Sequence, residues 1–132
     1  MCSRKRGGGA LERLDKEDSM EIIGKKIGSV SIVSLGGRLD AYASSELEQK
    51  LNAMVEADEV CLVANLEKLD YISSSGLRVL LASLKNVRKR EGDIKLACMK
   101  PYIKEVFDIA GFSQLFSIYD LEDVAIQAFN KK

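Results

Sequence analysis

The stretch "DYISSSGL", from Asp70 to Leu77, places three consecutive serines directly before a glycine and a segment with helical apolar spacing. Three hydroxyls at the start of a helix can do three kinds of chemistry. One can cap the helix by accepting a backbone N–H, one can act as a nucleophile, and one can accept a phosphate. These roles make different demands on the rest of the chain, so the sequence can separate them.

The nucleophile is the role that the composition excludes. The chain contains no histidine, which removes Ser-His-Asp and Cys-His catalysis and the ligand that most zinc sites use. A Gly-x-Ser-x-Gly turn is also excluded, because Ile72 stands two positions before Ser74. The sequence has no Walker phosphate loop and no GxGxxG motif after a strand. We therefore expect no enzyme activity, no catalytic residues, no metal and no cofactor.

Charge and length restrict the class of partner. The 132 residues fit one domain with its own core, and 20 basic residues balance 20 acidic ones. This balance gives no reason to expect direct nucleic-acid or membrane binding, and no apolar run approaches the roughly 18 residues that span a bilayer. The cysteines, Cys2, Cys61 and Cys98, are odd in number and form no CxxC pair. Unpaired thiols favour the reducing cytoplasm.

Apolar periodicity predicts a folded unit over residues 20–132, after a flexible tail over residues 1–19. Within this unit, strand-like runs alternate with helical segments. This alternation indicates βαβ crossovers and therefore an α/β fold, with a mixed, mainly parallel sheet and about four helices. The first two strands form an antiparallel hairpin around Gly28 and Ser29. The predicted strands span residues 21–27, 30–35, 60–64, 94–98 and 115–119, and residues 36–40 are a predicted loop.

The predicted helices have recognisable starts. The first begins at Ser45, which forms a capping box with Glu48. The second follows the serine run, with Ser74 or Ser75 as its N-cap. The other predicted helix boundaries are Ala57, Gly92, Pro101, Gly111 and a capping Asp120.

A phosphate-accepting serine is compatible with a helix cap. A helix N-terminus presents free N–H groups and partial positive charge, and Arg78 lies one turn after Ser74, where it can partly pair a phosphoserine. The serines also follow a parallel strand, at the edge where α/β sheets place their working surfaces. Gly76 costs roughly 1 kcal/mol in a first turn, which indicates either tight packing or room left for another group.

Two longer segments resemble a known family. They are "GGRLDAYASSEL" and "NLEKLDYISSSGLRVLLASLKNVRKREGDIKLACMKPYIKEVFDIAGFSQLFSIY", and they resemble STAS domains, in particular bacterial anti-sigma factor antagonists. The resemblance covers residues 20 to 129 and rests on "GRLD", "SSGL" and "VFDIAGF". It implies a single STAS domain over residues 20–132. It also implies a cycle: the antagonist binds an anti-sigma factor that is a serine kinase, a sigma factor is released, phosphorylation ends the complex, and a serine phosphatase restores it.

Carried over residue by residue, the resemblance makes Ser74 the phosphate acceptor. Many family members have aspartate immediately before the acceptor, where this chain has Ser73, so Ser73 and Ser75 stay open as alternative acceptors. The partner-binding residues that we expect are Asp40, Tyr42, Ser73, Ser74, Ser75, Gly76 and Arg78.

Some alternatives remain open at this stage. Asp40 is also a suitable turn former or helix cap, and Tyr42 fits either an interface or a packed position. Phe112 and Phe116 are expected in the core. For the whole protein, a STAS scaffold subunit of a larger signalling complex and a small-ligand or nucleotide module are the competing functions. Weak self-association is compatible with either.

Overall fold

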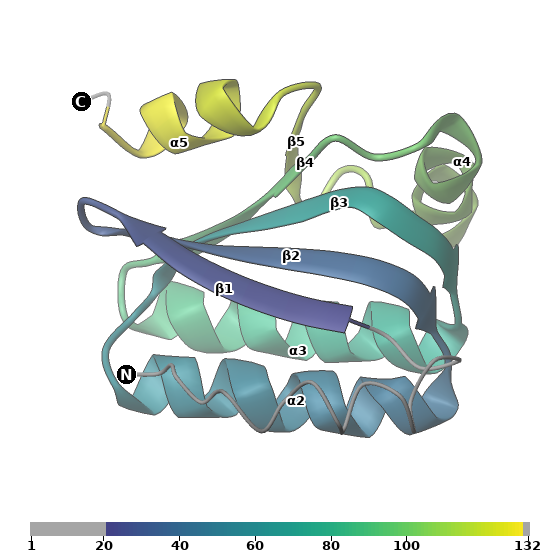
Figure 1. Cartoon of the computed structure of the whole chain (residues 1–132), viewed down its shortest axis with the longest axis horizontal. Helices are drawn as coiled ribbons and strands as arrows, with labels where there is room; N and C mark the ends of the chain where they lie inside the picture. The colour runs from purple at the N-terminus through teal and green to yellow at the C-terminus, as the bar shows by residue number, and fades with distance from the viewer. Residues whose placement is uncertain (1–20, 131–132) are drawn as a thin grey trace.

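The computed structural model describes residues 21–130, and in that range the chain forms a five-stranded sheet and four helices (Figure 1). The strands lie in chain order, β1-β2-β3-β4-β5, with β1 antiparallel to β2 and the other neighbours parallel. The predicted α/β class with a mixed, mainly parallel sheet is therefore confirmed. The predicted tail, residues 1–19, lies outside the described residues. The strands are β1 (Glu21–Ile27), β2 (Val30–Leu39), β3 (Cys61–Ile72), β4 (Asp93–Ala97) and β5 (Ser117–Tyr119).

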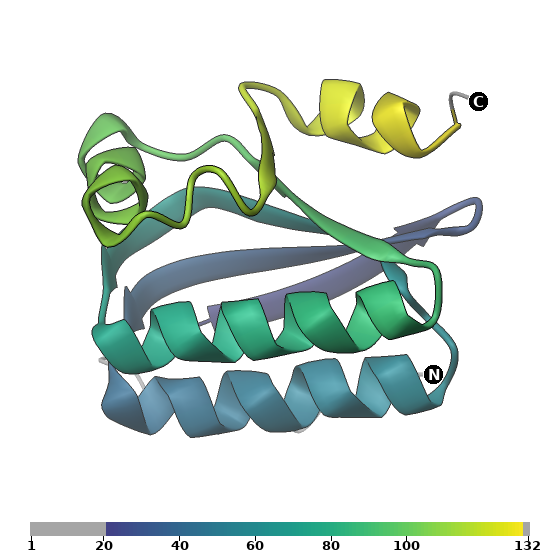
Figure 2. The ribbon, with the colours of Figure 1, turned by 180° about the vertical axis from the view of Figure 1, so that it is seen from behind.

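The helices divide between the two faces of the sheet. Helices α2 (Ala41–Glu56) and α3 (Ser74–Lys89) lie side by side on one face, and α5 (Glu122–Asn130) lies on the other (Figures 1 and 2). Helix α4 (Pro101–Ala110) packs near the end of β3. The main core fills the space under α2 and α3, whereas a smaller cluster packs beneath Ala125 and Ile126 of α5. Because the central strands are buried on both faces, they read as continuous apolar runs.

The leading hairpin forms as predicted. Ile27 pairs with Val30 across a turn made by Gly28 and Ser29, and β1 follows β2 in an unbroken antiparallel register. Helix α4 also keeps its predicted limits, with Pro101 at its first position and Gly111 in the left-handed conformation at its end, φ +80°. Strands β4 and β5 lie within two residues of their predicted limits.

Two strand ends were predicted wrongly. Residues 36–40 are not a loop, because β2 continues to Leu39, and β3 runs to Ile72 instead of ending at residue 64. Pairing between the two strands continues through polar residues and glycines as far as Leu39 opposite Ile72. Two irregularities in the β2–β3 register accompany this extension. A ladder of backbone bonds of this kind leaves no apolar pattern in either strand alone.

Three helix starts also differ from prediction. Helix α2 begins at Ala41 with Asp40 as N-cap, so the capping box at Ser45 is wrong. Helix α3 begins at Ser74 with Ser73 as N-cap, so neither Ser74 nor Ser75 caps it. In α5 the first backbone bond runs from the Ala125 N–H to the Leu121 carbonyl, which places Leu121, rather than Asp120, at the cap position.

Candidate functional site

The edge of the sheet where β2 and β3 end brings the predicted site residues together. Leu39 pairs with Ile72 at the end of the register, so Asp40 and Ser73 each follow directly and open a helix. The Ser73 backbone N–H donates to the Leu39 carbonyl at 2.9 Å, which ties one strand-to-helix connection to the other. Both helices start at this end of the sheet (Figure 1). We call this surface the switch edge: residues 38–42, residues 71–75 and Arg78.

Both helix starts at the switch edge are capped by a side chain. The Asp40 Oδ1 atom accepts from the Ala43 N–H at 2.9 Å, and the Ser73 Oγ atom accepts from the Gly76 N–H at 3.1 Å. Each bond satisfies a backbone donor that the helix itself leaves free. The reading of Asp40 as a helix cap is therefore correct, and Ser73 has the same structural role one strand away.

The three serines differ in exposure. Ser74 is exposed at the first helical position, whereas Ser73 and Ser75 are half-buried. Among residues 21–130, nothing forms a hydrogen bond with the Ser74 hydroxyl, and the Ser73 hydroxyl is engaged in the cap. Ser74 therefore presents the most accessible hydroxyl of the run.

Close packing explains why position 76 is a glycine. It is buried, and a Cβ atom at this position would lie 2.7 Å from Leu39 Cγ, 2.8 Å from Leu39 Cδ2 and 3.1 Å from Ile72 Cγ1. Helix α3 thus begins in close contact with the ends of both strands. Since Gly76 is covered, it positions the serines and does not itself form part of the exposed surface.

An open groove of about 350 Å³ runs between the N-terminal halves of α2 and α3. Ser75 and Arg78 line it from α3, and Ser44, Ser45 and Glu48 line it from α2. The structure therefore brings Arg78 and Ser75 to one wall. The Arg78 guanidinium is exposed and has no ion-pair partner within residues 21–130.

Aromatic side chains flank the serines. Tyr42 is 71% exposed in the first turn of α2, so it does not occupy the packed position that was one of its two predicted environments. Arg38 and Tyr71 are opposite each other in the β2–β3 register, and the guanidinium carbon lies 4.4 Å from the ring centroid. No local pattern in the chain predicts this pair, because its formation depends on strand register. By contrast, Phe116 is buried and Phe112 packs against the core, as expected.

An ion pair lies at the start of α4, beside the switch edge. The Lys100 Nζ atom lies 2.6 Å from Asp70 Oδ1, and the hydrogen bond to this carboxylate raises the pKa of the Lys100 ammonium. Tyr102 is half exposed next to it. These residues were also missed, because the pair joins β3 to α4 across thirty positions of the chain.

The described part of the chain contains no cluster of three or more His, Cys, Asp or Glu residues suited to a metal ion. None of its helices combines the length and apolar character needed to cross a bilayer. The arrangement at the switch edge is an exposed hydroxyl on a rigid helix start, with a carboxylate, a guanidinium and tyrosines around it. Such a surface can bind a partner and accept a modification.

Comparison with known proteins gives consistent results. A family model of the STAS domain matches residues 21–125. A candidate anti-sigma factor antagonist of Bordetella bronchiseptica, BtrV, is 37% identical over 110 residues, which cover 83% of this chain and 95% of BtrV.

Two solved structures extend the comparison. An anti-sigma factor antagonist from Mycobacterium paratuberculosis has a TM-score of 0.79 at 26% identity, covering 86% of this chain and 97% of its own. The phosphorylated form of Bacillus SpoIIAA has a TM-score of 0.67 at 20% identity, covering 83% of this chain and 99% of its own, and shares the fold.

Proposed function

This chain belongs to the STAS domain family, and from that premise we propose that it is an anti-sigma factor antagonist that binds through the switch edge. Its partner in this proposal is an anti-sigma factor with serine kinase activity, and binding frees a sigma factor. Phosphorylation of Ser74 ends the complex, and a serine phosphatase restores the antagonist. The cycle takes place in the cytoplasm and involves neither direct DNA contact nor a membrane.

The observation that carries this proposal is the separation of two roles within the serine run. Ser73 caps α3, while Ser74, the next residue, is exposed and leaves its hydroxyl free. A phosphate on Ser74 therefore leaves the cap in place. It would also lie at a helix N-terminus, where the partial positive charge tolerates an anion. The fold can accept the modification while the surface changes.

The charge of the phosphate supplies the switch. Phosphorylation adds about −1.5 to −2 charges beside Asp40, whose carboxylate already lies at this edge. A partner that packs here would have to desolvate the phosphate and meet two like charges. Arg78, one turn along α3, pairs with the phosphate only in part. A penalty of a few kcal/mol suffices, since about 1.4 kcal/mol is a tenfold change in affinity.

The partner-binding residues have two kinds of role in this proposal. Tyr42, Asp40 and Arg78 present side chains to the partner, together with Ser74 and Ser75 at the edge of the groove. Ser73 and Gly76 act by position: one caps α3, and the other lets α3 pack against Leu39.

The deciding experiment is a kinase reaction. The full chain is incubated with its cognate anti-sigma factor and ATP, and the site is mapped by peptide mass spectrometry. We expect one phosphate, on Ser74, and none in Ser74→Ala. The matched control Ser45→Ala, on the α2 wall of the adjacent groove, should be phosphorylated like the wild type. A phosphate found on Ser73 or Ser75 instead would contradict the assignment.

The alternative function, a STAS scaffold subunit of a larger signalling complex, makes a different prediction about assembly. Size-exclusion chromatography with light scattering separates the two. A monomer or a weakly associated dimer fits an antagonist, whereas a stable high-order assembly of the isolated chain fits a scaffold and counts against a simple antagonist cycle.

A further inference from the structure

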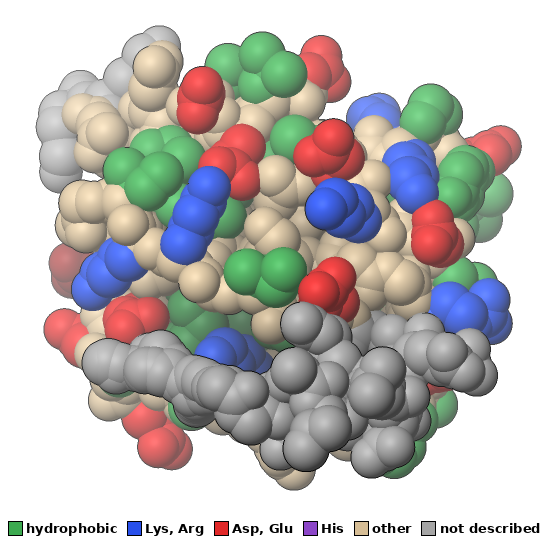
Figure 3. All heavy atoms as spheres, viewed as in Figure 1, with side chains coloured by type: hydrophobic (Ala, Val, Ile, Leu, Met, Phe, Trp, Pro, Cys, Tyr) green, Lys and Arg blue, Asp and Glu red, His purple; other side chains and the backbone are tan. Residues whose placement is uncertain are grey.

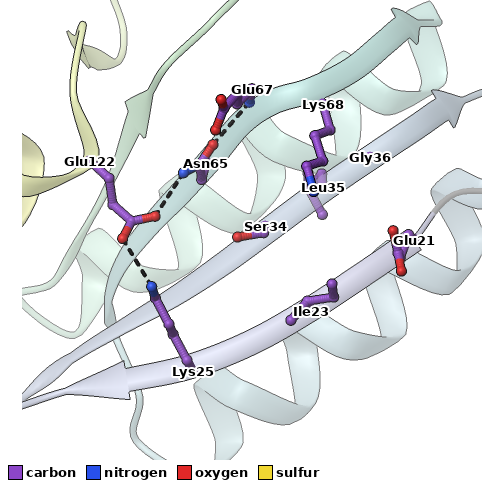
Figure 4. A pocket seen from close by; sticks show the side chains of 10 residues that line it. All are labelled: Glu21, Ile23, Lys25, Ser34, Leu35, Gly36, Asn65, Glu67, Lys68 and Glu122. Carbon is purple, nitrogen blue, oxygen red and sulfur yellow. Dashed lines mark hydrogen bonds and ion pairs between the residues drawn. The ribbon is translucent and has the colours of Figure 1, made fainter.

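A pocket of about 230 Å³ opens on the face of the sheet that α5 only partly covers (Figure 4). Acidic and basic side chains are interspersed on this face of the molecule (Figure 3). In the close view, Ser34 of β2 lies near the centre, with Lys25 and Glu122 on one side and Lys68 on the other. The pocket lies away from α2 and α3, so it is separate from the groove beside Ser75.

A β-bulge builds one wall of this pocket. Ser34 pairs with Asn65 and Gly36 with Lys68, so β3 advances three residues while β2 advances two. Successive side chains of a regular strand alternate between faces, but Glu67 and Lys68 are both exposed and both line the pocket. The extra residue therefore places an acid and a base together, as bulges next to functional sites redirect side chains.

Gly36 adds room opposite this wall. A Cβ atom at Gly36 would lie 3.3 Å from Lys68 Cβ, tighter than an ordinary contact. A glycine inside a strand otherwise weakens it, and often marks a place where another group approaches closely. Here it lies at the pocket and next to the bulge.

The wall on the side of α5 is internally satisfied. Asn65 Nδ2 donates to Glu122 Oε1 at 2.7 Å, and Lys25 Nζ lies 3.2 Å from Glu122 Oε2. The Oδ1 atom of Asn65 accepts from the Glu67 backbone N–H at 2.9 Å. The hydrogen bond from Asn65, supported by Lys25, lowers the pKa of Glu122 and keeps it ionised. This wall is rigid and charge-balanced.

The bulge wall is left open. Within residues 21–130, no hydrogen bond or ion pair engages the Lys68 ammonium, the Glu67 carboxylate or the Ser34 hydroxyl. These groups comprise one cation, one anion and one neutral donor-acceptor around a small volume. A purely anionic ligand would meet three carboxylates, those of Glu21, Glu67 and Glu122. A purely cationic ligand would meet the ammonium groups of Lys68 and Lys25.

We propose that this pocket binds a small zwitterion of the free α-amino-acid class. The ligand carboxylate lies against the Lys68 ammonium and accepts from the Ser34 hydroxyl, and its ammonium group donates to the Glu67 carboxylate. Ile23, which also lines the pocket and is 52% exposed, offers apolar surface to the ligand side chain. The volume is below that of drug-sized sites, as expected for a ligand of this size. This site does not depend on the proposed antagonist function.

The test is a titration of the ¹⁵N-labelled full chain with each common free α-amino acid, followed in two-dimensional NMR spectra. We expect at least one amino acid to cause saturable shifts of the amide signals of Ser34, Gly36, Glu67 and Lys68. Lys68→Met and Glu67→Gln should each weaken binding at least tenfold. Lys26→Met and Glu56→Gln are matched controls on exposed residues outside the pocket, and they should bind like the wild type.

Single-charge probes sharpen the result. Acetate and methylamine each carry half of the zwitterion, and both should bind more weakly than the amino acid. The proposal is overturned if no amino acid gives saturable shifts at millimolar concentrations, if Lys68→Met binds unchanged, or if acetate alone binds as tightly. Since no kinase takes part, these outcomes are independent of the fate of Ser74.

Discussion

The starts of α2 and α3 are two versions of one structure. Asp40 and Ser73 occupy the same cap position, and each side chain accepts from the backbone N–H three residues on, belonging to Ala43 in one case and Gly76 in the other. The cap of α2 is a fixed negative charge, whereas that of α3 is neutral. The difference indicates a division of roles within one surface.

The positions after the cap continue this contrast. The first helical position is exposed in both helices, and it is Ala41 in α2 but Ser74 in α3. Only α3 therefore has a hydroxyl at this position, and it is the one on which we propose that a phosphate is added and removed. At the third position Ala43 fits as a buried methyl, while Gly76 has no room for one. Helix α3 is thus held more tightly against the strand ends at the place where modification is proposed.

Of the changes that we predict at these two helix starts, phosphorylation of Ser74 should have the largest effect. We expect stoichiometric phosphate on Ser74 to weaken binding of the anti-sigma factor at least a hundredfold, about 3 kcal/mol, because it adds charge next to Asp40. Isothermal calorimetry measures the change, and Ser74→Ala should bind like the unmodified protein. Ala41→Asp supplies a charge at the matching position of α2 and should weaken binding less. Equal affinity of the phosphorylated and unmodified forms would rule out the electrostatic switch.

Gly76→Ala tests how tightly α3 is held. The added methyl would overlap Leu39, and overpacking of this kind costs about 1–3 kcal/mol of unfolding free energy, against a gain of about 1 from helix propensity. Urea unfolding should therefore show none of the gain expected from helix propensity, and a net loss of up to about 2 kcal/mol. Ala43→Gly, at the equivalent position of α2, should cost about 2 kcal/mol, because it lowers helix propensity by about 1 and removes a buried methyl worth about 0.8. If Gly76→Ala were more stable than the wild type by the full 1 kcal/mol or so of helix propensity, the packing explanation of this glycine would be wrong.

Substitution of either cap residue should have a smaller effect on stability. Asp40→Ala and Ser73→Ala should each lower the unfolding free energy by about 1 kcal/mol, since each removes a capped N–H. Ser73→Asp, by contrast, keeps a capping oxygen and should leave stability nearly unchanged. It also places a second fixed charge beside Ser74, so kinase assays on this variant show whether the neutral cap favours phosphorylation. A large loss of stability in Ser73→Asp would contradict the equivalence of the two caps.

Both helix starts were predicted too far along the chain, and for one physical reason. Periodicity detects large apolar residues, but the first buried positions are Ala43 in α2 and Gly76 in α3. The apolar pattern of each helix therefore begins only at the leucines that follow. The α/β class and the hairpin were predictable because strand and helix periods and the short turn are local signals.

What could not be predicted depends on contacts between distant segments. The contact between Arg38 and Tyr71 follows from the β2–β3 register. The pocket depends on a bulge that places Gly36 opposite Lys68. Neither feature has a signature within a single strand. The "GRLD" and "SSGL" motifs, however, do meet at one edge, because the first lies at the end of β2, the second follows the end of β3, and these two strands are parallel.

The start of α5 extends the comparison to a helix without a side-chain cap of this kind, and it gives the smallest expected effect. Glu122, at its first position, is held by Asn65 and Lys25, which lower its pKa. A carboxylate with a lowered pKa stabilises the fold fully above its unfolded pKa of about 4.3, and this contribution is lost as the pH falls through the lower folded value. Between pH 7 and pH 3 the wild type should therefore lose more stability than Glu122→Gln, by up to about 1 kcal/mol.

Urea unfolding at both pH values measures this difference. The control is Glu56→Gln, which removes an exposed carboxylate at the end of α2 and should lose as much stability as the wild type. Identical pH dependence of the wild type and Glu122→Gln would show that this helix start relies on the packing of Ala125 and Ile126 alone.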